Sequence, residues 1–347
     1  MEADYLIHKR LICSMKWTIF LISVLVLVAC QHKNKPPDVS AIPVNLQVIR
    51  FEDAFFNLDT QHLEVAFEQL NNKYPGFAKD FLFNILGTTP DSAKKDALSF
   101  ISSYQLLYDS AKNQYAHFQP IANDVKKGLQ YVKYYFPQYP LPTNLISFIG
   151  PINSYGNIVT TNALAVGLQM YMGKEYSLYA TEMGQQLYPA YISRRFEKAY
   201  IPVNCMNNIV DDLFPNKSLG KPLVEQMIEA GKRQYLLDLF LPELADTLKL
   251  GYSEMQLNEC NRNEAAIWAF FIQNNLLYIT EPEITKEYMN DAPSTQALGL
   301  AFPGKLGNFV GLKIVQKWIS KNGAVTPDKL MKMPAGQLFE ESKYKPN

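Results

Sequence analysis

The stretch that decides the fold runs from residue 144 to residue 171 and reads NLISFIGPINSYGNIVTTNALAVGLQMY. It contains short apolar runs at 145–149, 158–161 and 163–171, which Pro, Gly and Asn residues separate. Short aliphatic and β-branched runs that are interrupted by turn residues are typical of paired β-strands. The stretch therefore predicts an antiparallel hairpin or a small meander.

Helical patterns surround this stretch on both sides. Apolar residues recur at spacings of three and four, which is the helical period, in residues 61–73, 77–86, 92–110, 119–136, 222–240, 261–278 and 307–320. Alternation predicts one further strand at 44–51, and no Pro or Gly cluster and no repeat divides residues 42–347. The sequence thus predicts an α+β fold, in which one mostly helical domain of residues 42–347 surrounds a small, mainly antiparallel sheet.

An export signal precedes this domain. An uncharged apolar run, residues 18–29, follows Lys16 and ends at Cys30. The run is too short for a membrane-spanning helix, which needs about 20 apolar residues. A basic start, an apolar stretch and small residues before the cleavage site are the plan of a secretory signal. We expect residues 1–29 to be removed as a signal peptide. Alternatively, translation starts at Met15, and the signal peptide is then residues 15–29.

A lipid attachment site ends the signal. Residues 27–30, Leu-Val-Ala-Cys, resemble the lipobox of bacterial lipoproteins, in which acyl chains such as palmitate modify the cysteine. Residues 30–41 are polar and contain prolines, so we expect a flexible tether that reaches roughly 35 Å. Gln31 stands where Asp would retain the protein in the inner membrane, and no acidic run follows. These features favour a periplasm-facing anchor in the outer membrane, with Cys30 bound to membrane lipid.

Composition narrows the class of protein. Apolar residues make up 48% of the chain and aromatic residues 13%, which supports a large packed core. Of the 33 basic and 33 acidic residues, three basic and two acidic ones precede Cys30, so the mature chain carries a net charge of −1. This balance argues against a nucleic-acid partner.

Two cysteines remain after the signal and Cys30 are set aside. Cys205 and Cys260 could form one disulfide, because the periplasm is oxidising. Two buried free thiols are the alternative that we favour, since the sequence gives no distance with which to test bridge geometry. Both alternatives stay open.

The sequence contains no complete catalytic motif. The histidines of the mature chain are His32, His62 and His117, and no His-Glu-x-x-His pattern occurs. A catalytic zinc usually takes three protein ligands. Nucleophile elbows and glycine-rich phosphate loops are also missing from the sequence. We therefore expect no metal, no cofactor and no enzyme activity, with His62 and His117 as surface or packed residues.

Carboxylates and tyrosines are the remaining candidates. Glu229 follows Glu225 by four residues and would share its helix face, although basic residues nearby favour a solvated charged surface. The densest aromatic stretch includes Tyr134, Tyr135 and Tyr139. Such rings could stack on a sugar, but large aromatic side chains mostly pack in the hydrophobic core.

Several stretches together resemble the gliding-motility lipoprotein GldB family of Bacteroidetes. In chain order they are YYFP (134–137), VGLQMYMG (166–173), MIEAGK (227–232), GYS (251–253), NE (263–264) with IWAFF (267–271), PG (303–304) and SKYKP (342–346). The resemblance implies an envelope lipoprotein associated with gliding and with the type IX secretion system, without an established catalytic activity. Gln169 replaces an expected acidic residue and Phe309 an expected tryptophan, which indicates a divergent member.

The order of predicted elements also resembles that of a zincin-type peptidase, with strand 163–171, helix 204–213 and helix 225–237. In such a peptidase the middle helix carries two metal-binding histidines four residues apart. Asn204 and Asn208 stand at those positions here, and amides cannot replace imidazoles on zinc. The resemblance implies a zincin-like fold without the metal motif, in which Asn204, Asn208 and Glu229 would mark a degenerate site.

The sequence thus favours a non-catalytic envelope lipoprotein that acts through contacts with proteins of the motility or secretion machinery. Two alternatives stay open. One is a degenerate zincin-like hydrolase that uses Glu229. The other is a glycan-binding module that uses Tyr134, Tyr135 and Tyr139.

Overall fold

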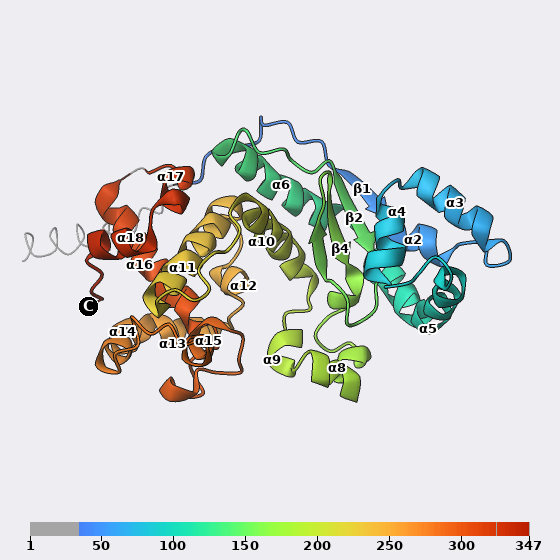
Figure 1. Ribbon diagram of the computed structural model, residues 1–347. Helices are drawn as coiled ribbons and strands as arrows, with labels where there is room; N and C mark the ends of the chain where they lie inside the picture. The colour runs from blue at the N-terminus through green and yellow to red at the C-terminus, as the bar shows by residue number, and fades with distance from the viewer. Residues whose placement is uncertain (1–34, 324, 347) are drawn as a thin grey trace, which may run out of the picture. The chain divides into compact units, whose positions relative to one another are not determined.

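The computed structural model describes residues 35–323 and 325–346. The expected signal peptide, with Met15 and Cys30, lies outside these residues, as does the first part of the tether. The chain from Val39 onward forms one compact unit (Figure 1). Among the described residues, no helix combines the length and the apolar character that crossing a membrane requires.

The first part of the compact unit contains all the described strands. Its elements are β1 (Gln47–Arg50), α2 (Phe51–Phe56), α3 (Leu63–Lys73), α4 (Phe77–Asp80), the π-helix η1 (Phe81–Ile85), α5 (Ala93–Gln114), α6 (Gln119–Tyr135), β2 (Asn144–Phe148), β3 (Asn157–Val159), β4 (Ala163–Gly167) and the 3-10 helix η2 (Leu168–Met170).

The second part is helical. Its elements are α7 (Ser177–Ala180), α8 (Glu182–Leu187), α9 (Ala190–Ser193), η3 (Lys198–Tyr200), α10 (Ile201–Leu213), α11 (Leu223–Phe240), α12 (Asp246–Leu250), α13 (Glu254–Arg262), α14 (Glu264–Gln273), α15 (Pro282–Met289), η4 (Gln296–Leu298), α16 (Leu306–Asn322), α17 (Pro327–Lys332) and α18 (Ala335–Ser342). The prediction of a mostly helical α+β fold is confirmed.

The strands form one sheet in the order β1-β2-β4-β3. The β1–β2 and β2–β4 pairs are parallel, and only β3 and β4 pair in antiparallel fashion. The prediction of a mainly antiparallel sheet is therefore wrong, although its hairpin exists as β3 and β4. Sequence neighbours β2 and β3 do not pair, because residues 149–156 carry the chain past the position of β4 to the far edge.

One buried amide fixes this connection between β2 and β3. Gln169 lies in η2, which replaces the last part of the predicted strand 163–171, and is fully buried. Its Oε1 accepts from the Gly150 N–H at 3.0 Å, and its Nε2 donates to the Tyr155 carbonyl at 3.1 Å. A carboxylate has no hydrogen to donate. Glutamine, and not the expected acidic residue, therefore satisfies both ends of the connection.

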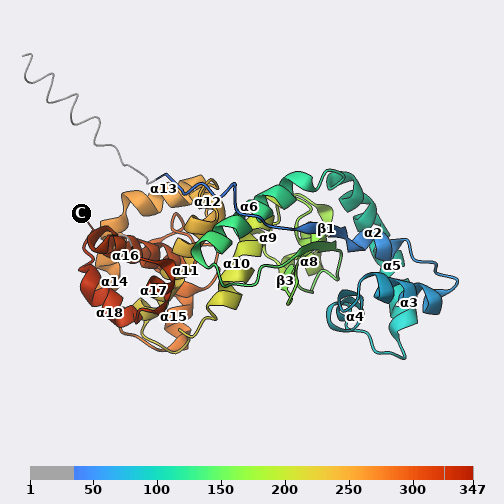
Figure 2. The same ribbon diagram turned by 90° about the horizontal axis from the view of Figure 1, so that it is seen from above.

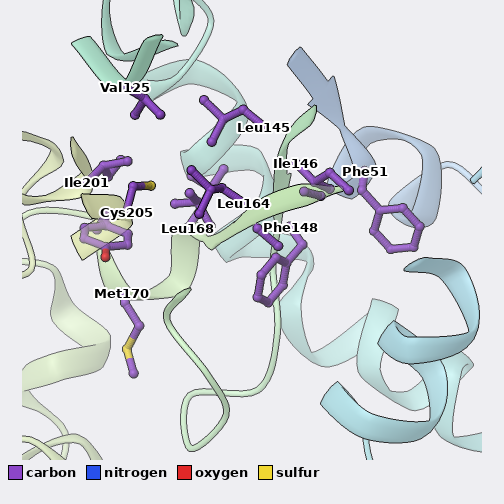
Figure 3. Packing of buried hydrophobic residues seen from close by; sticks show 14 of the residues in the cluster. Phe51, Val125, Leu145, Ile146, Phe148, Leu164, Leu168, Met170, Ile201 and Cys205 are labelled. Carbon is purple, nitrogen blue, oxygen red and sulfur yellow. The ribbon is translucent and has the colours of Figure 1, made fainter. Parts of the chain in front are cut away.

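The sheet separates two apolar layers, because successive side chains of a strand point to opposite faces. On one face, β2 and β4 meet α6 and α10 through Leu145, Leu164, Val125, Ile201 and Cys205 (Figure 3). On the other face, Ile146 and Phe148 lie toward Phe51 (Figure 3). The Phe51 ring is 4.9 Å from the rings of Phe77 and Phe81, within the range of favourable aromatic pairs. We call the apolar residues of both layers the sheet cluster.

A second group of buried residues, the C-terminal cluster, surrounds α11 and α16, which lie side by side (Figure 1 and Figure 2). These helices approach closely enough for their backbones to touch. A Cβ atom on Gly311 would lie 1.6 Å from the Met227 carbonyl oxygen, and one on Gly231 would lie 2.1 Å from the Gly311 carbonyl carbon. Only glycine at both positions permits this crossing. Because α11 also contributes Leu236 and Phe240 to the sheet cluster, it joins the two cores.

The predicted helix 261–278 is interrupted, because α13 ends at Arg262 and α14 begins at Glu264. Asn263 donates to the Glu259 carbonyl from its backbone N–H at 3.1 Å and from its side-chain amide at 3.0 Å. Such local bonds from an asparagine side chain compete with helix continuation. Sequence periodicity alone does not reveal this break.

Candidate functional site

The first candidate residue, Asn204, belongs to a chain of polar side chains between α10 and β3. Its Nδ2 donates to the hydroxyl of Tyr171 at 2.7 Å, and that hydroxyl donates to the side-chain oxygen of Asn157. Tyr171 is buried, and burial raises its pKa, so the phenol stays protonated. Asn208 lies one turn further along α10, is partly exposed and takes no part in these contacts. Asn204 thus connects two structural elements.

Glu229 lies elsewhere. Its carboxylate accepts from the ammonium of the fully buried Lys232 at 2.8 Å, and Lys232 also donates to the Met333 carbonyl at 2.5 Å. Glu229 borders a cavity of about 320 Å³ that Phe214 also lines, at the end of α10. Asn204 precedes Phe214 by ten residues, which is roughly 15 Å of helix. The structure therefore does not bring Glu229 together with Asn204.

The three tyrosines of the proposed sugar platform do not present one flat surface. The rings of Tyr134 and Tyr135 are 4.9 Å apart but meet edge to face, at 89°. The Tyr139 hydroxyl donates to Asp212 at 2.6 Å, and burial raises the pKa of Tyr139. Tyr134 is 49% exposed and remains available for a contact.

The two cysteines do not form the disulfide that was one of the two alternatives. Cys205 and Cys260 are both buried free thiols, because Cys205 belongs to the sheet cluster and Cys260 to the C-terminal cluster. Burial raises the pKa of each thiol to about 12. Since the thiolate is the reactive form, both are unreactive at neutral pH.

Metal-binding groups are missing from the described part of the chain. Within residues 35–323 and 325–346, no three His, Cys, Asp or Glu side chains are placed to hold an ion. His62 and His117 are both exposed, and His62 pairs with Asp59 at 2.8 Å. The prediction that these histidines are surface or packed residues is confirmed.

Sequence reasoning missed a buried ion pair where β1 and β2 end. Glu52 is 1% exposed, and its carboxylate accepts from the Ser147 hydroxyl at 2.8 Å and from the Arg50 guanidinium. Arg50 also donates to the Tyr115 carbonyl at 2.7 Å. Desolvation raises the pKa of Glu52, and the charge of Arg50 opposes this rise. The group joins β1, α2, β2 and the end of α5.

A serine beside a carboxylate raises the question of nucleophilic chemistry. Such chemistry needs a base within reach of the hydroxyl and access for a substrate. Ser147 is fully buried, and the carboxylate that accepts its proton is already engaged by Arg50. The arrangement therefore connects structural elements, and it leaves the Ser147 hydroxyl without access to a substrate. The sequence signal that could have found it is Arg50-x-Glu52 directly after an apolar strand.

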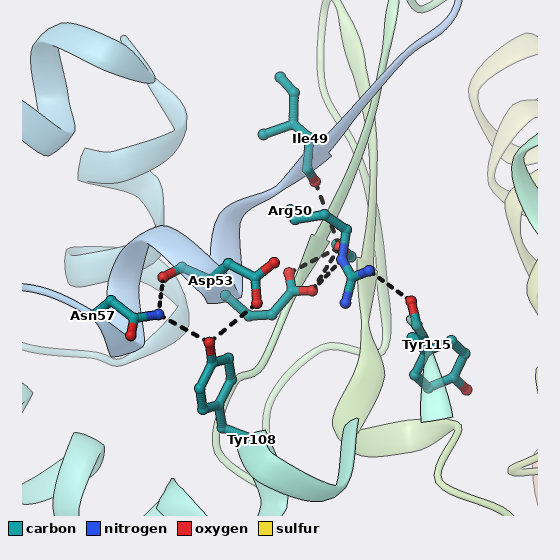
Figure 4. Close-up of polar contacts among 8 residues, drawn as sticks. Ile49, Arg50, Asp53, Asn57, Tyr108 and Tyr115 are labelled. Atoms are coloured by element: carbon teal, nitrogen blue, oxygen red, sulfur yellow. Dashed lines mark hydrogen bonds and ion pairs between the residues drawn. The ribbon is translucent and has the colours of Figure 1, made fainter. Parts of the chain in front are cut away.

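Beside this ion pair, a second polar group connects α2 and α5. Tyr108 donates from its hydroxyl to Asp53 at 3.1 Å and accepts from the Asn57 amide at 2.9 Å (Figure 4). Burial raises the pKa of Tyr108, so the phenol remains a donor at neutral pH. These bonds leave the second oxygen of Asp53 without a partner among the described residues.

A cavity of about 890 Å³ opens over the sheet face that carries Ile146. Its floor is the amino half of the sheet, where Gln47, Asn144 and Ala163 lie side by side in register. Its wall is formed by α2, by Asp80 and by the connection between α3 and α4. The aromatic rings of the sheet cluster cover the carboxyl half of the same face. The small side chain of Ala163 leaves the amino half open, and this cavity is the candidate binding site.

A known protein family matches this chain. The family described as "Gliding motility protein GldB" matches residues 32–346, which is most of the chain. No curated protein and no solved structure matches the chain significantly. The chain therefore belongs to the GldB family of gliding-motility lipoproteins.

Proposed function

We propose that this protein is a non-catalytic lipoprotein of the outer membrane that faces the periplasm and works by binding other envelope proteins. Membership of the GldB family places it among motility lipoproteins. The proposed partners are proteins of the gliding or type IX secretion machinery. Nucleic acid is not among them, because the mature chain is nearly neutral.

The anchor in this proposal is an acyl group on Cys30, which ends the lipobox. Gln31 at the second position supports sorting to the outer membrane. The polar residues between Cys30 and Val39 would hold the compact unit within a few tens of ångströms of the bilayer. A partner protein in the same membrane would then meet this domain at a high effective concentration.

The single observation that carries the non-catalytic part is the set of contacts made by Asn204. In a zincin-like fold its position would belong to a zinc-binding imidazole, and here its amide is bonded to Tyr171. The carboxylate of Glu229, the residue that the alternative hydrolase would use, is bonded to the buried Lys232. These contacts support a site whose polar groups maintain the structure.

The first experiment tests the anchor. Cells expressing the wild type or Cys30→Ala are fractionated, and the amino-terminal peptide of the mature protein is examined by mass spectrometry. We expect an acylated Cys30 in the wild type and loss of the variant from the membrane fraction. An unmodified cysteine with an intact leader would contradict the proposal.

The second experiment tests the absence of catalysis. The full mature lipoprotein is purified in detergent, and its zinc content and peptidase turnover are measured beside those of Glu229→Gln. We expect no stoichiometric zinc and no turnover that the substitution removes. Stoichiometric zinc with turnover, or activity that depends on Glu229, would favour the hydrolase.

A further inference from the structure

We infer that the outer edge of β1 docks an extended segment of a partner protein, which carries a basic side chain and adds a strand to the sheet. This inference rests on the proposed function as a protein-binding lipoprotein and names the surface that such binding uses.

The hydrogen-bond ladder leaves this edge open. β1 pairs only with β2, and the Gln47 N–H donates to the Thr143 carbonyl at 2.8 Å. In a parallel pair, alternate residues direct their backbone groups to the same neighbour. Gln47 and Ile49 therefore face β2, while the N–H and C=O of Val48 and the N–H of Arg50 face outward. Within the described residues these outward groups form no backbone hydrogen bond.

The surroundings of β1 leave room for a strand. All four residues of β1 line the cavity of about 890 Å³, and each is at least partly exposed. In β2, by contrast, the side chains from Leu145 to Phe148 are buried. A strand added about 4.8 Å from β1 would satisfy the outward groups and place every second side chain over the cavity. Because β1 has only four residues, the docked segment is short.

The charges around the cavity indicate which side chain the segment carries. Asp53 accepts from Tyr108 through one oxygen, and Asp80 accepts from Asn84 through one oxygen at 3.1 Å. Each carboxylate keeps a second oxygen without a partner among the described residues. Lys73 supplies one positive charge, and Arg50 is already paired with Glu52.

Among the described residues that line the cavity, these two carboxylates outnumber the single ammonium of Lys73, so the net charge is negative. A Lys or Arg side chain on the docked segment would complement it. A saccharide could bond to the amides of the cavity floor, but it offers no backbone to match donors and acceptors at strand spacing. The open ladder therefore favours a peptide.

The test uses the full mature lipoprotein in detergent micelles and, as the probe, a phage-displayed library of random peptides of about 12 residues, long enough to span the edge. Enriched peptides are synthesised, and their Kd values are measured for four forms of the protein. These are the wild type, Val48→Pro, Val48→Thr and Asp80→Asn. Proline removes the outward N–H and is tolerated at sheet edges. Threonine keeps that N–H and serves as the matched control.

We expect enriched peptides that carry Lys or Arg. Val48→Pro should weaken their binding about tenfold, as expected for the loss of a main-chain hydrogen bond. Val48→Thr should bind like the wild type, and Asp80→Asn should weaken binding of the basic peptides several-fold. Peptide addition should also slow hydrogen exchange at the Val48 and Arg50 amides of the wild type. That measurement decides the matter if Val48→Pro fails to fold.

The inference is overturned if no peptide is enriched, if Val48→Pro binds as well as Val48→Thr, or if exchange at the two amides does not change. Binding of soluble peptidoglycan fragments in the cavity, without peptide binding, also overturns it. Crosslinking in cells separates this failure from failure of the proposed function. Partners captured equally by the wild type and by Val48→Pro would leave the protein-binding role intact and remove only its assignment to β1.

Discussion

The sheet cluster and the C-terminal cluster are held together by different means. Around the sheet, buried polar groups such as Glu52 and Gln169 join elements that are far apart in the sequence. The C-terminal part has such a group in Lys232, but there α11 and α16 also meet backbone to backbone at Gly231 and Gly311. Close helix packing leaves little space at that crossing, whereas the sheet carries a cavity and an open edge. We infer that binding belongs to the sheet and that the C-terminal helices support it.

The largest expected effect breaks the helix crossing. Gly311→Ala places a methyl group 1.6 Å from the Met227 carbonyl, so the helices must separate. We expect the free energy of unfolding to fall by about 3 kcal/mol, the upper end for overpacking. Urea denaturation of the mature protein measures it.

Gly336→Ala is the matched control for that substitution. The nearest atom to a Cβ there is Glu225 Oε1 at 3.8 Å, an ordinary contact, and the residue lies in α18. It should be neutral or slightly stabilising, because alanine favours helices. Equal effects of the two substitutions would contradict the close approach of α11 and α16.

The next effect concerns the connection between β2 and β3. Gln169→Glu keeps the bond from the Gly150 N–H but leaves the Tyr155 carbonyl without its donor. We expect the free energy of unfolding to fall by about 2 kcal/mol, because a buried carboxylate lacks the hydrogen that the amide supplies. Thermal unfolding measures this loss. Gln69→Glu, at an exposed position, is the control. An unchanged midpoint would show that this loop does not depend on the amide.

The buried ion pair should make the stability of the protein depend on pH. Burial raises the pKa of Glu52 above its ordinary value of 4.5. The unfolded chain then releases this proton at a lower pH than the folded chain does. The contribution of Glu52 to stability therefore falls as pH rises from 4.5 to the raised pKa.

Glu52→Gln cannot release a proton and lacks this slope. The wild type should accordingly lose stability relative to Glu52→Gln as pH rises above 4.5, in urea titrations at several pH values. Glu68→Gln, at an exposed position, controls for the loss of one negative charge. A difference that stays constant with pH would contradict the raised pKa.

The smallest expected effect concerns the first candidate residue. Asn204→Ala removes the donor to Tyr171 and should lower the free energy of unfolding by about 1 kcal/mol, the usual net value of one hydrogen bond. Asn208→Ala, on the same helix but outside these contacts, should have less effect. Circular dichroism in urea compares them. A larger loss for Asn208→Ala would contradict the assignment.

The sequence predicted the features that depend on neighbouring residues. Helical periodicity identified α6 and α11, and turn residues identified the hairpin of β3 and β4. The resemblance to the GldB family, drawn from short ordered stretches, is confirmed over residues 32–346.

The sequence did not predict the features that depend on residues far apart in the chain. The parallel pair of β1 and β2 joins segments separated by six helical elements, and Ser147 meets Glu52 across 95 positions. Periodicity carries no information on such pairing, because it reports only which face of an element is apolar. The cavity also depends on register, since it opens where Ala163 lies beside Asn144.

The central claim is that a lipid-anchored domain works by contact with other envelope proteins. Crosslinking in intact cells of the native organism, followed by mass spectrometry, tests it most directly when the wild type is compared with Cys30→Ala. The account predicts that the same few envelope proteins are recovered with the wild type and lost with the unanchored variant. Recovery of no protein with either form, or an unchanged set without the anchor, would contradict it.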